Sequence, residues 1–344
     1  MSKKIIKLET NTWIQAYHIR NYELGILQTK TPWIFSKYIN CYYNPQANSH
    51  FDHYMPEGRF FAKSKPLLVQ KFKFDKTIFS LKTFDFLQWA RQLINSGWCI
   101  MGYFDEYYIK CKTRYNKIHY RHSLLIYGYD DDTRLFYAIG YTNEKKYQQH
   151  GLTYDEFISA IGVEFDRQNE KFKKRDIDRI EFNGIKLNPN YEFQIDLKQL
   201  YNSLMDYIYS EADGNRCRNG VTYGLGCENE FVNYISNQRG EYLDVRYSRF
   251  FMELKELMVR RLEYLVNEKI VSQLLLDEYK KICESQKIIH LLFIKCNLAY
   301  KDNIIDQLIA RMAEVISAEK KILPQIGNEI YAYLVEKHDE EYFL

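Results

Sequence analysis

The sequence lacks several features that would assign it to a common class of protein. Glycine and proline are scarce, with 15 and 6 residues among 344. Their scarcity argues against a glycine-rich dinucleotide fold and against a collagen-like or linker-rich chain. An excess of one charge is also lacking, because 48 Lys and Arg residues face 45 Asp and Glu residues. Nucleic-acid-binding modules usually carry a concentrated basic excess, so this near balance disfavours that function.

Long hydrophobic runs are missing as well. No stretch approaches the roughly 18 apolar residues that a membrane helix needs. The N-terminus has basic residues but no apolar stretch of signal-peptide length after them. We therefore expect a cytoplasmic, soluble protein with no membrane partner.

Familiar catalytic and metal-binding motifs are absent too. There is no C-x-x-C pair, no P-loop, no G-x-S-x-G and no H-E-x-x-H. His50, Asp52 and His53 resemble a metal cluster but lie in an expected loop without a nearby further ligand. We therefore expect no metal and no cofactor. The cysteines are irregularly spaced, which predicts free thiols in a reducing compartment: they are Cys41, Cys99, Cys111, Cys217, Cys227, Cys283 and Cys296.

What the chain does have is length, aromatic residues and a change of pattern. Its 344 residues favour two domains, and aromatic residues make up 16% of the chain. Near residue 185 a mixture of helix and strand patterns gives way to patterns that are nearly all helical. The sequence predicts an α+β protein with an antiparallel sheet in residues 1–185 and a mainly helical domain in residues 186–344.

In the first part, apolar periodicity and turn residues define the expected elements. Asp85 and Gly97 are expected to begin and end a helix, and Thr153 with Glu156 has the spacing of a capping box. Residues 130–132 are expected to form the turn of a hairpin. The expected helices cover residues 10–28 and 85–97, with a short helical segment after Pro32, and the expected strands cover residues 67–74, 98–104, 123–129 and 134–141.

In the second part, stripes of apolar residues predict antiparallel packed helices. Proline breaks helices, so Pro324 is expected to end the fourth of them. The expected helices cover residues 197–208, 250–265, 279–298 and 304–322, with a last helix to about residue 336.

The stretch from Phe104 to Tyr141 holds most of the residues suited to chemistry. His122 begins an apolar strand that would hold its imidazole in one orientation, as a general base requires. A cysteine nucleophile needs such a base to form its thiolate. Cys41 precedes His122, which is the chain order of papain-like folds, and a polar group on the next strand would orient the ring. That strand offers Tyr141 and then Asn143, with no carboxylate at the expected place.

The same stretch resembles a known family. Residues 122–131 (HSLLIYGYDD), followed by residues 136–141 (FYAIGY), resemble the histidine strand and hairpin of papain-like proteins in the butirosin-biosynthesis H (BtrH) N-terminal-domain group. Residues 105–109 (DEYYI) resemble the same group. In the second half, further segments resemble the helical part of these proteins: residues 223–225, 243–246, 253–255 and 260–265.

The resemblance implies a function in natural-product assembly, of the nonribosomal-peptide or thioamide (closthioamide) type. It implies an acyltransferase that forms an amide from a carrier-protein thioester and an amine, through a cysteine thioester. In this chain Cys41 is expected to be the nucleophile, His122 the base and Asn143 the orienting group. His119, Tyr141 and Trp33 are expected to bind substrate. The expected partners are a carrier protein or carrier-bound thioester and an amine acceptor, with a homodimer as one possible assembly.

The chain departs from the family pattern in two places. The family's nucleophile begins the first core helix, where the helix dipole stabilises a thiolate. Here the expected helix 10–28 has no cysteine, and Cys41 falls at the end of the next helical segment. Gly140 also stands where an aspartate is expected. Two alternatives therefore stay open: a degenerate papain-like scaffold that binds a carrier protein or peptide, and a cysteine peptidase or amidase.

Overall fold

The structure is a computed structural model whose contacts divide the chain into two compact units. The first, here called the sheet unit, comprises residues 1–29 and 64–191, and the second, the helical unit, comprises residues 30–63 and 192–344. The division expected at residue 185 assigned residues 30–63, with Cys41, to the first domain, whereas their contacts place them in the helical unit. The structure describes residues 2–16, 18–37, 39–46, 51–53, 69–74, 84–161, 182–190, 192–211, 219–299 and 302–337.

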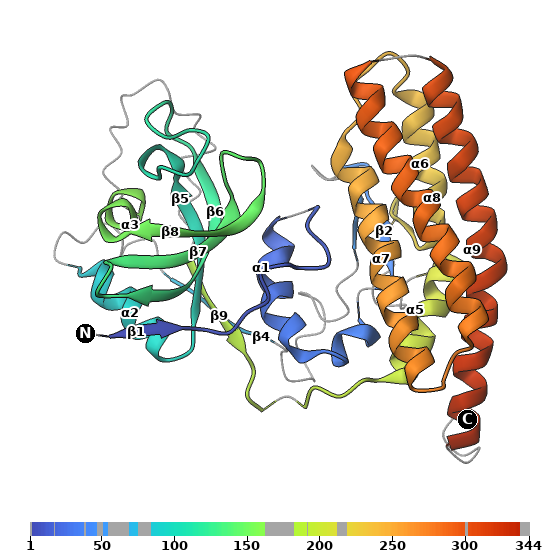
Figure 1. The fold of residues 1–344 in the computed structure, drawn as a ribbon, viewed down its shortest axis with the longest axis horizontal. Helices are drawn as coiled ribbons and strands as arrows, with labels where there is room; N and C mark the ends of the chain where they lie inside the picture. The colour runs from blue at the N-terminus through green and yellow to red at the C-terminus, as the bar shows by residue number, and fades with distance from the viewer. Residues whose placement is uncertain are drawn as a thin grey trace. The chain divides into compact units, whose positions relative to one another are not determined.

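An antiparallel sheet forms the centre of the sheet unit (Figure 1). Within the described residues it has seven strands in the order β4-β9-β5-β6-β7-β8, and β1 pairs with β6. The expected strands and hairpin around the His122 stretch are confirmed as β5, β6 and β7. The strands are β1 Lys3–Ile5, β4 Val69–Lys73, β5 Cys99–Asp105, β6 Arg121–Asp130, β7 Leu135–Tyr141, β8 Tyr147–Thr153 and β9 Phe182–Leu187.

Local capping signals explain where the helices of this unit begin and end. The Asp85 carboxylate accepts a hydrogen bond from the Gln88 N–H at 2.9 Å and begins α2 (Phe86–Asn95). Gly97 follows with a φ of +82°, a conformation that glycine adopts without strain. The expected capping box is confirmed at α3 (Tyr154–Ile161), because Thr153 and Glu156 each bond the other's backbone N–H at 3.1 and 2.8 Å.

The expected helix over residues 10–28 is wrong in its first half. Helix α1 covers only His18–Leu27 and continues as a short 3₁₀ turn, η1 (Gln28–Lys30). The Gln28 amide bonds the Trp13 N–H and the Asn11 carbonyl, which satisfies backbone groups outside a helix. Side chains that bond nearby backbone in this way compete with helix formation.

The sheet and its helices enclose one hydrophobic core. Residues from β5, β6 and β7 meet residues from α2 and α3, and their side chains are wholly or almost wholly buried. Burying each such side chain contributes roughly 1.5–3 kcal/mol to folding. The core therefore fixes β5 and β6 against each other, and the candidate site lies at the end of this strand pair. Representative members are Ala90, Ile100, Ile126, Phe136 and Phe157.

The helical unit is built from five long helices among its described residues (Figure 1). α8 packs against α7 and α9, and α9 also packs against α5 and α6. A small sheet with the order β10-β2-β3 lies against this bundle through contacts of β2 and β10 with α6. The elements are η2 Trp33–Ser36, β2 Cys41–Tyr43, β3 Phe51–His53, α5 Leu197–Tyr209, β10 Thr222–Tyr223, α6 Leu225–Asn237, α7 Val245–Asn267, α8 Gln273–Leu298 and α9 Asp302–Lys337.

The expected helices of this half are confirmed in α5, α7 and α8, but the expected stop at Pro324 is wrong. Pro324 lies inside α9, which runs without a break to Lys337. A proline in a helix interior costs about 3 kcal/mol, and the packing of α9 against three other helices offsets that cost. The sequence patterns did not predict α6. None of the described helices is long and apolar enough to span a membrane.

Candidate active site in the sheet unit

Cys41, the expected nucleophile, lies in the helical unit and is fully buried. The expectation that it ends a helical segment is wrong, because its backbone is extended in β2 and pairs with His53 of β3. Its thiol donates to the Gly224 carbonyl, with 3.6 Å between Sγ and oxygen. His122, the expected base, belongs to the sheet unit. Neither unit by itself therefore contains the cysteine–histidine pair.

Trp33, an expected substrate-binding residue, also lies in the helical unit. Its side chain is buried in η2, and its ring meets the Phe193 ring edge-on at 5.2 Å between centroids. The Lys37 ammonium lies 5.3 Å from the centre of the indole ring. These contacts make Trp33 part of a packed interior.

The sheet unit positions the two expected histidines at the end of the β5–β6 ladder. In this ladder Phe104 lies opposite His122, and Asp105 lies opposite Arg121. The chain then leaves β5 through a 3₁₀ turn, η4 (Glu106–Tyr108), which starts with the Glu106 N–H bonded to the Tyr120 carbonyl at 2.9 Å. This turn keeps the residues after β5 beside the residues that begin β6.

The imidazole of His122 is held by a carboxylate. His122 Nδ1 lies 2.9 Å from Glu106 Oε1, and the Glu106 side chain is 8% exposed while that of His122 is 25% exposed. An ionised carboxylate can only accept hydrogen bonds, so a neutral His122 ring that bonds to such a carboxylate carries its proton on Nδ1 and its lone pair on Nε2. Glu106 thus orients the ring as the third member of a catalytic triad does.

His119 has a carboxylate partner of its own, bound more tightly into the fold. Its Nδ1 lies 2.7 Å from Asp105 Oδ2, and its ring stacks on the Tyr107 ring at 4.1 Å between centroids. The other oxygen of Asp105 accepts from the backbone N–H groups of Tyr107 and Tyr120 at 3.1 and 3.0 Å. Asp105 therefore holds the turn as well as the imidazole.

Asn143 and Tyr141, the other expected site residues, lie at the end of β7. Asn143 is exposed, and its backbone N–H donates to the Cys111 carbonyl at 2.8 Å. The hydroxyl of Tyr141 donates to the Gln15 carbonyl at 2.9 Å. Sequence reasoning expected Asn143 beside His122 and missed Glu106. The available signal was its position directly after β5, since the antiparallel partner of that strand, β6, carries His122.

A buried cation lies near this pair of histidine–carboxylate contacts. Lys112 is 4% exposed, and its Nζ donates to the Tyr141 carbonyl at 2.5 Å. Burial lowers the pKa of Lys112, and the charge of Glu106 opposes that shift. Burial also raises the pKa of Tyr22, whose hydroxyl donates to the Ser123 carbonyl at 2.8 Å. The site thus combines a partly exposed base with charged and polar groups in a largely buried setting.

The helical unit contains a second polar cluster, which is sealed from solvent. Lys255 of α7 donates to Glu228 and to Glu319, with 2.6 Å between Nζ and the Glu319 oxygen. Tyr207 donates to Glu228 at 2.6 Å, and Tyr279 donates to Glu319 at 2.5 Å. Burial, followed by the charge of Glu228, raises the pKa of Glu319 to about 7.

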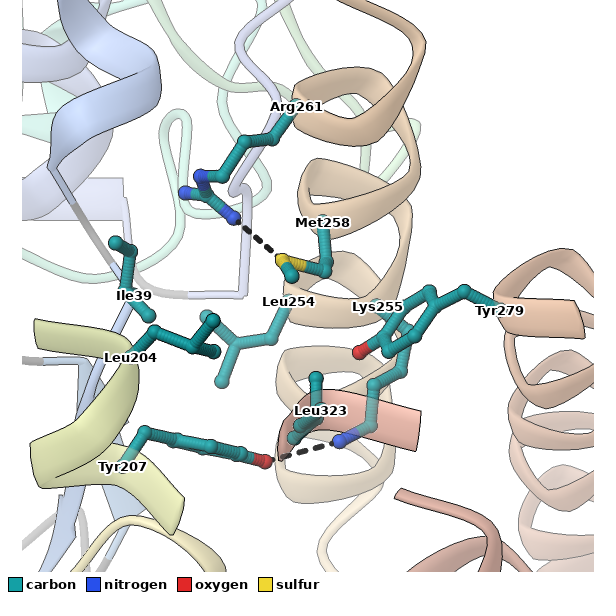
Figure 2. A pocket seen from close by; sticks show the side chains of 9 residues that line it. All are labelled: Ile39, Leu204, Tyr207, Leu254, Lys255, Met258, Arg261, Tyr279 and Leu323. Carbon is teal, nitrogen blue, oxygen red and sulfur yellow. Dashed lines mark hydrogen bonds between the residues drawn. The ribbon is translucent and has the colours of Figure 1, made fainter. Parts of the chain in front are cut away.

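A small cavity adjoins this sealed cluster. Its volume is about 20 Å³, close to the space that one water molecule needs. Figure 2 shows the Lys255 ammonium beside the Tyr207 hydroxyl. It also shows the Arg261 guanidinium, which donates a hydrogen bond to the Met258 sulfur. A space of this size holds about one water molecule and no organic substrate, so we take the histidine–carboxylate contacts of the sheet unit as the candidate site.

Comparisons with known proteins add no family assignment. No protein-family model and no curated protein matches the sequence. Over the described part of the chain, no group of three or more His, Cys, Asp or Glu side chains is placed to hold a metal ion. His50, of the cluster considered in the sequence, and Cys217 lie outside the described residues.

Proposed function

We propose that the protein transfers an acyl group from a thioester to an amine, with His122 as general base and Glu106 as its positioning residue. The observation that carries the proposal is the 2.9 Å contact between His122 Nδ1 and Glu106 Oε1 at the end of a rigid strand pair. The sheet unit is proposed to be papain-like, which rests on the resemblance of the histidine strand and its hairpin to that fold.

The proposed reaction needs only a base and an activated donor. The amine attacks the thioester carbonyl while His122 Nε2 takes its proton, and a tetrahedral intermediate forms. The carbon–sulfur bond then breaks, and the imidazolium returns the proton to the departing thiolate. The products are an amide and a free thiol, so atoms and charge balance. A positioned general base contributes typically 10²- to 10⁴-fold to such a rate.

This mechanism does not use Cys41 as a nucleophile. The Cys41 thiol is buried in the helical unit and donates to a backbone carbonyl. A reactive cysteine is instead usually partly exposed and close to a positive group. A thioester donor is already activated, so direct attack by the amine replaces the acyl-enzyme expected from the sequence.

The proposed donor is a thioester on a carrier protein, and the proposed setting is natural-product assembly in the cytoplasm. The family resemblance supports the donor class. The cysteines of the described residues are free thiols, which suits a reducing compartment. A homodimer also stays a proposal. The molecular mass of the purified protein in solution tests it.

The test is amide formation from a panel of short acyl thioesters of N-acetylcysteamine and primary amines, measured by liquid chromatography and mass spectrometry. We expect His122→Ala to lower the rate at least 10²-fold. Cys41→Ser is the matched control and is expected to keep the rate. Loss of the rate in Cys41→Ser, together with an acylated Cys41 peptide in the wild type, would overturn direct transfer in favour of the cysteine mechanism.

A second candidate is a papain-like scaffold that binds a carrier protein or peptide without chemistry. The observation that favours it is the complete burial of Cys41, because a papain-like enzyme exposes its nucleophile. If the scaffold is correct, the wild-type protein forms no amide from the panel and still binds acylated carrier protein at equilibrium. That result would support the scaffold and contradict the proposed transferase activity.

A further inference from the structure

Two buried cysteines of the helical unit meet around the backbone of Gly224. The Cys41 thiol donates to the Gly224 carbonyl, and the Cys227 N–H donates to the same oxygen at 2.9 Å. The Gly224 N–H in turn donates to the Cys41 carbonyl at 3.0 Å. The Cys227 thiol interacts with the Cys41 thiol and donates to the Thr222 carbonyl at 3.2 Å.

Gly224 bonds to both cysteines through its backbone. Its φ of +54° and ψ of −136° lie in a region that only glycine adopts readily. A Cβ at this position would lie 2.2 Å from the Tyr207 carbonyl oxygen, so no other residue fits without moving the backbone. The glycine lies between the end of β10 and the start of α6, which fixes Cys41 of β2 beside the first turn of that helix.

We propose that Cys41 and Cys227 form a reversible disulfide bond when the protein meets a hydroperoxide. In the first step one thiolate attacks the peroxide, which oxidises its sulfur to a sulfenic acid and releases water or an alcohol. The second thiol then attacks that sulfur, the disulfide forms and a second molecule of water leaves. Two thiols lose two electrons and two protons, and the hydroperoxide accepts both.

The surroundings of the pair make this exchange slow in both directions. Both side chains are fully buried, and burial raises the pKa of the Cys227 thiol, so the reactive thiolate is rare while the fold is closed. Oxidation therefore follows local opening of β2 from β10. Once formed, the disulfide joins two residues that lie 186 positions apart in the chain (41 and 227) and keeps β2 attached to α6.

The proposal does not depend on the proposed transferase reaction, because that reaction is assigned to the sheet unit. The test treats the full chain with hydrogen peroxide, blocks the remaining thiols with N-ethylmaleimide and maps unreduced peptides by mass spectrometry. We expect a linked peptide pair that contains Cys41 and Cys227. The oxidised protein should also melt several degrees higher than the reduced protein, and reduction by dithiothreitol should reverse the shift.

Matched variants separate this pair from the other cysteines. Cys41→Ser and Cys227→Ser should each remove the linked pair and the rise in melting temperature. Cys283→Ser, which changes another buried free thiol, should keep both. Peptides that link Cys217 to either cysteine, or oxidation to sulfonic acid without any link, would overturn the proposal.

Discussion

Each unit pairs carboxylates with nitrogen groups, and the two sets differ in their access to solvent. In the helical unit the Lys255 side chain is 2% exposed and its two carboxylate partners are fully buried. In the sheet unit the imidazoles of His119 and His122 are 21% and 25% exposed, although their carboxylate partners are largely buried. Both sets have short contacts, so distance alone does not distinguish a structural cluster from a candidate active site.

The difference shows what burial does to a pair of ionisable groups. Burying a charge removes all of its hydration, and in the sealed cluster only the contacts between the charged groups offset that loss. One oxygen of Glu228 is buried and has no hydrogen-bond partner among the described residues, which adds to that cost. A partly exposed imidazole with a buried carboxylate keeps a fixed orientation while part of its ring reaches the surface. The first arrangement governs stability, and the second suits proton transfer.

The largest expected effect on stability comes from a substitution that breaks the sealed cluster. Lys255→Met leaves two buried carboxylates without their cation, so we expect the free energy of unfolding to fall by about 3–5 kcal/mol. Urea denaturation at pH 7, followed by circular dichroism, measures the change. If Lys255→Met unfolds at the wild-type urea concentration, the cluster does not contribute as its burial implies.

The next effect separates the two histidine–carboxylate pairs. Asp105→Ala removes the acceptor of two backbone N–H groups and of His119, so we expect a loss of about 2–3 kcal/mol in stability. Glu106→Ala removes the contact to His122 and should cost about 1 kcal/mol. Amide formation should fall more in Glu106→Ala than in Asp105→Ala, and the opposite order would make Asp105–His119 the catalytic pair.

The sealed cluster should also make stability depend on pH. Burial raises the pKa of Glu319 in the folded protein to about 7, above its ordinary value of 4.5, so the folded state binds the extra proton. The stabilisation from that proton is complete below pH 4.5 and is lost as the pH rises through 7. We expect a decrease of about 2 kcal/mol between pH 5 and 7.5. Urea titrations at several pH values should show this slope in the wild type and a flatter one in Glu319→Gln.

The smallest expected effect on stability comes from a solvent-exposed ion pair. Lys281 donates to Glu278 one turn away on α8, and their side chains are 71% and 44% exposed. Exposed pairs of this kind contribute little to stability. Lys281→Ala should therefore leave the melting temperature unchanged, and it serves as the control for Lys255→Met. A clear shift would show that exposure is a poor guide to the energetics of this bundle.

Local signals in the sequence predicted much of the fold. Asp85, Gly97 and the Thr153–Glu156 box act through bonds to residues at most four positions away, so their effect can be read from a short window. Pro324 failed as a signal because packing of α9 against distant helices outweighs a local preference. The aromatic and aliphatic stripes of the long helices were equally readable, since they follow the helical period.

Only part of the candidate site could be predicted from the sequence. His122 was found because it begins an apolar strand, and His119 because it lies three residues before His122. Glu106 required knowledge of how β5 and β6 align. Cys41 was misread as the end of a helical segment because β2 has only three residues, too few to show a strand pattern. One of its neighbouring strands is also remote in the sequence, since Tyr43 of β2 pairs with Thr222 of β10, 179 residues later. Pairings of such long range are set by the folded chain as a whole.

That long-range pairing has a consequence for how the chain is made. Strand β2 emerges from the ribosome long before β10, since Cys41 and Gly224 are separated by 183 residues. At a synthesis rate of roughly 5–20 residues per second, about 10 to 40 s pass between the synthesis of β2 and that of β10. During that interval the Cys41 thiol has neither its carbonyl acceptor nor the helix that covers it. A fully buried thiol of the finished helical unit is therefore among those exposed for longest in the nascent chain.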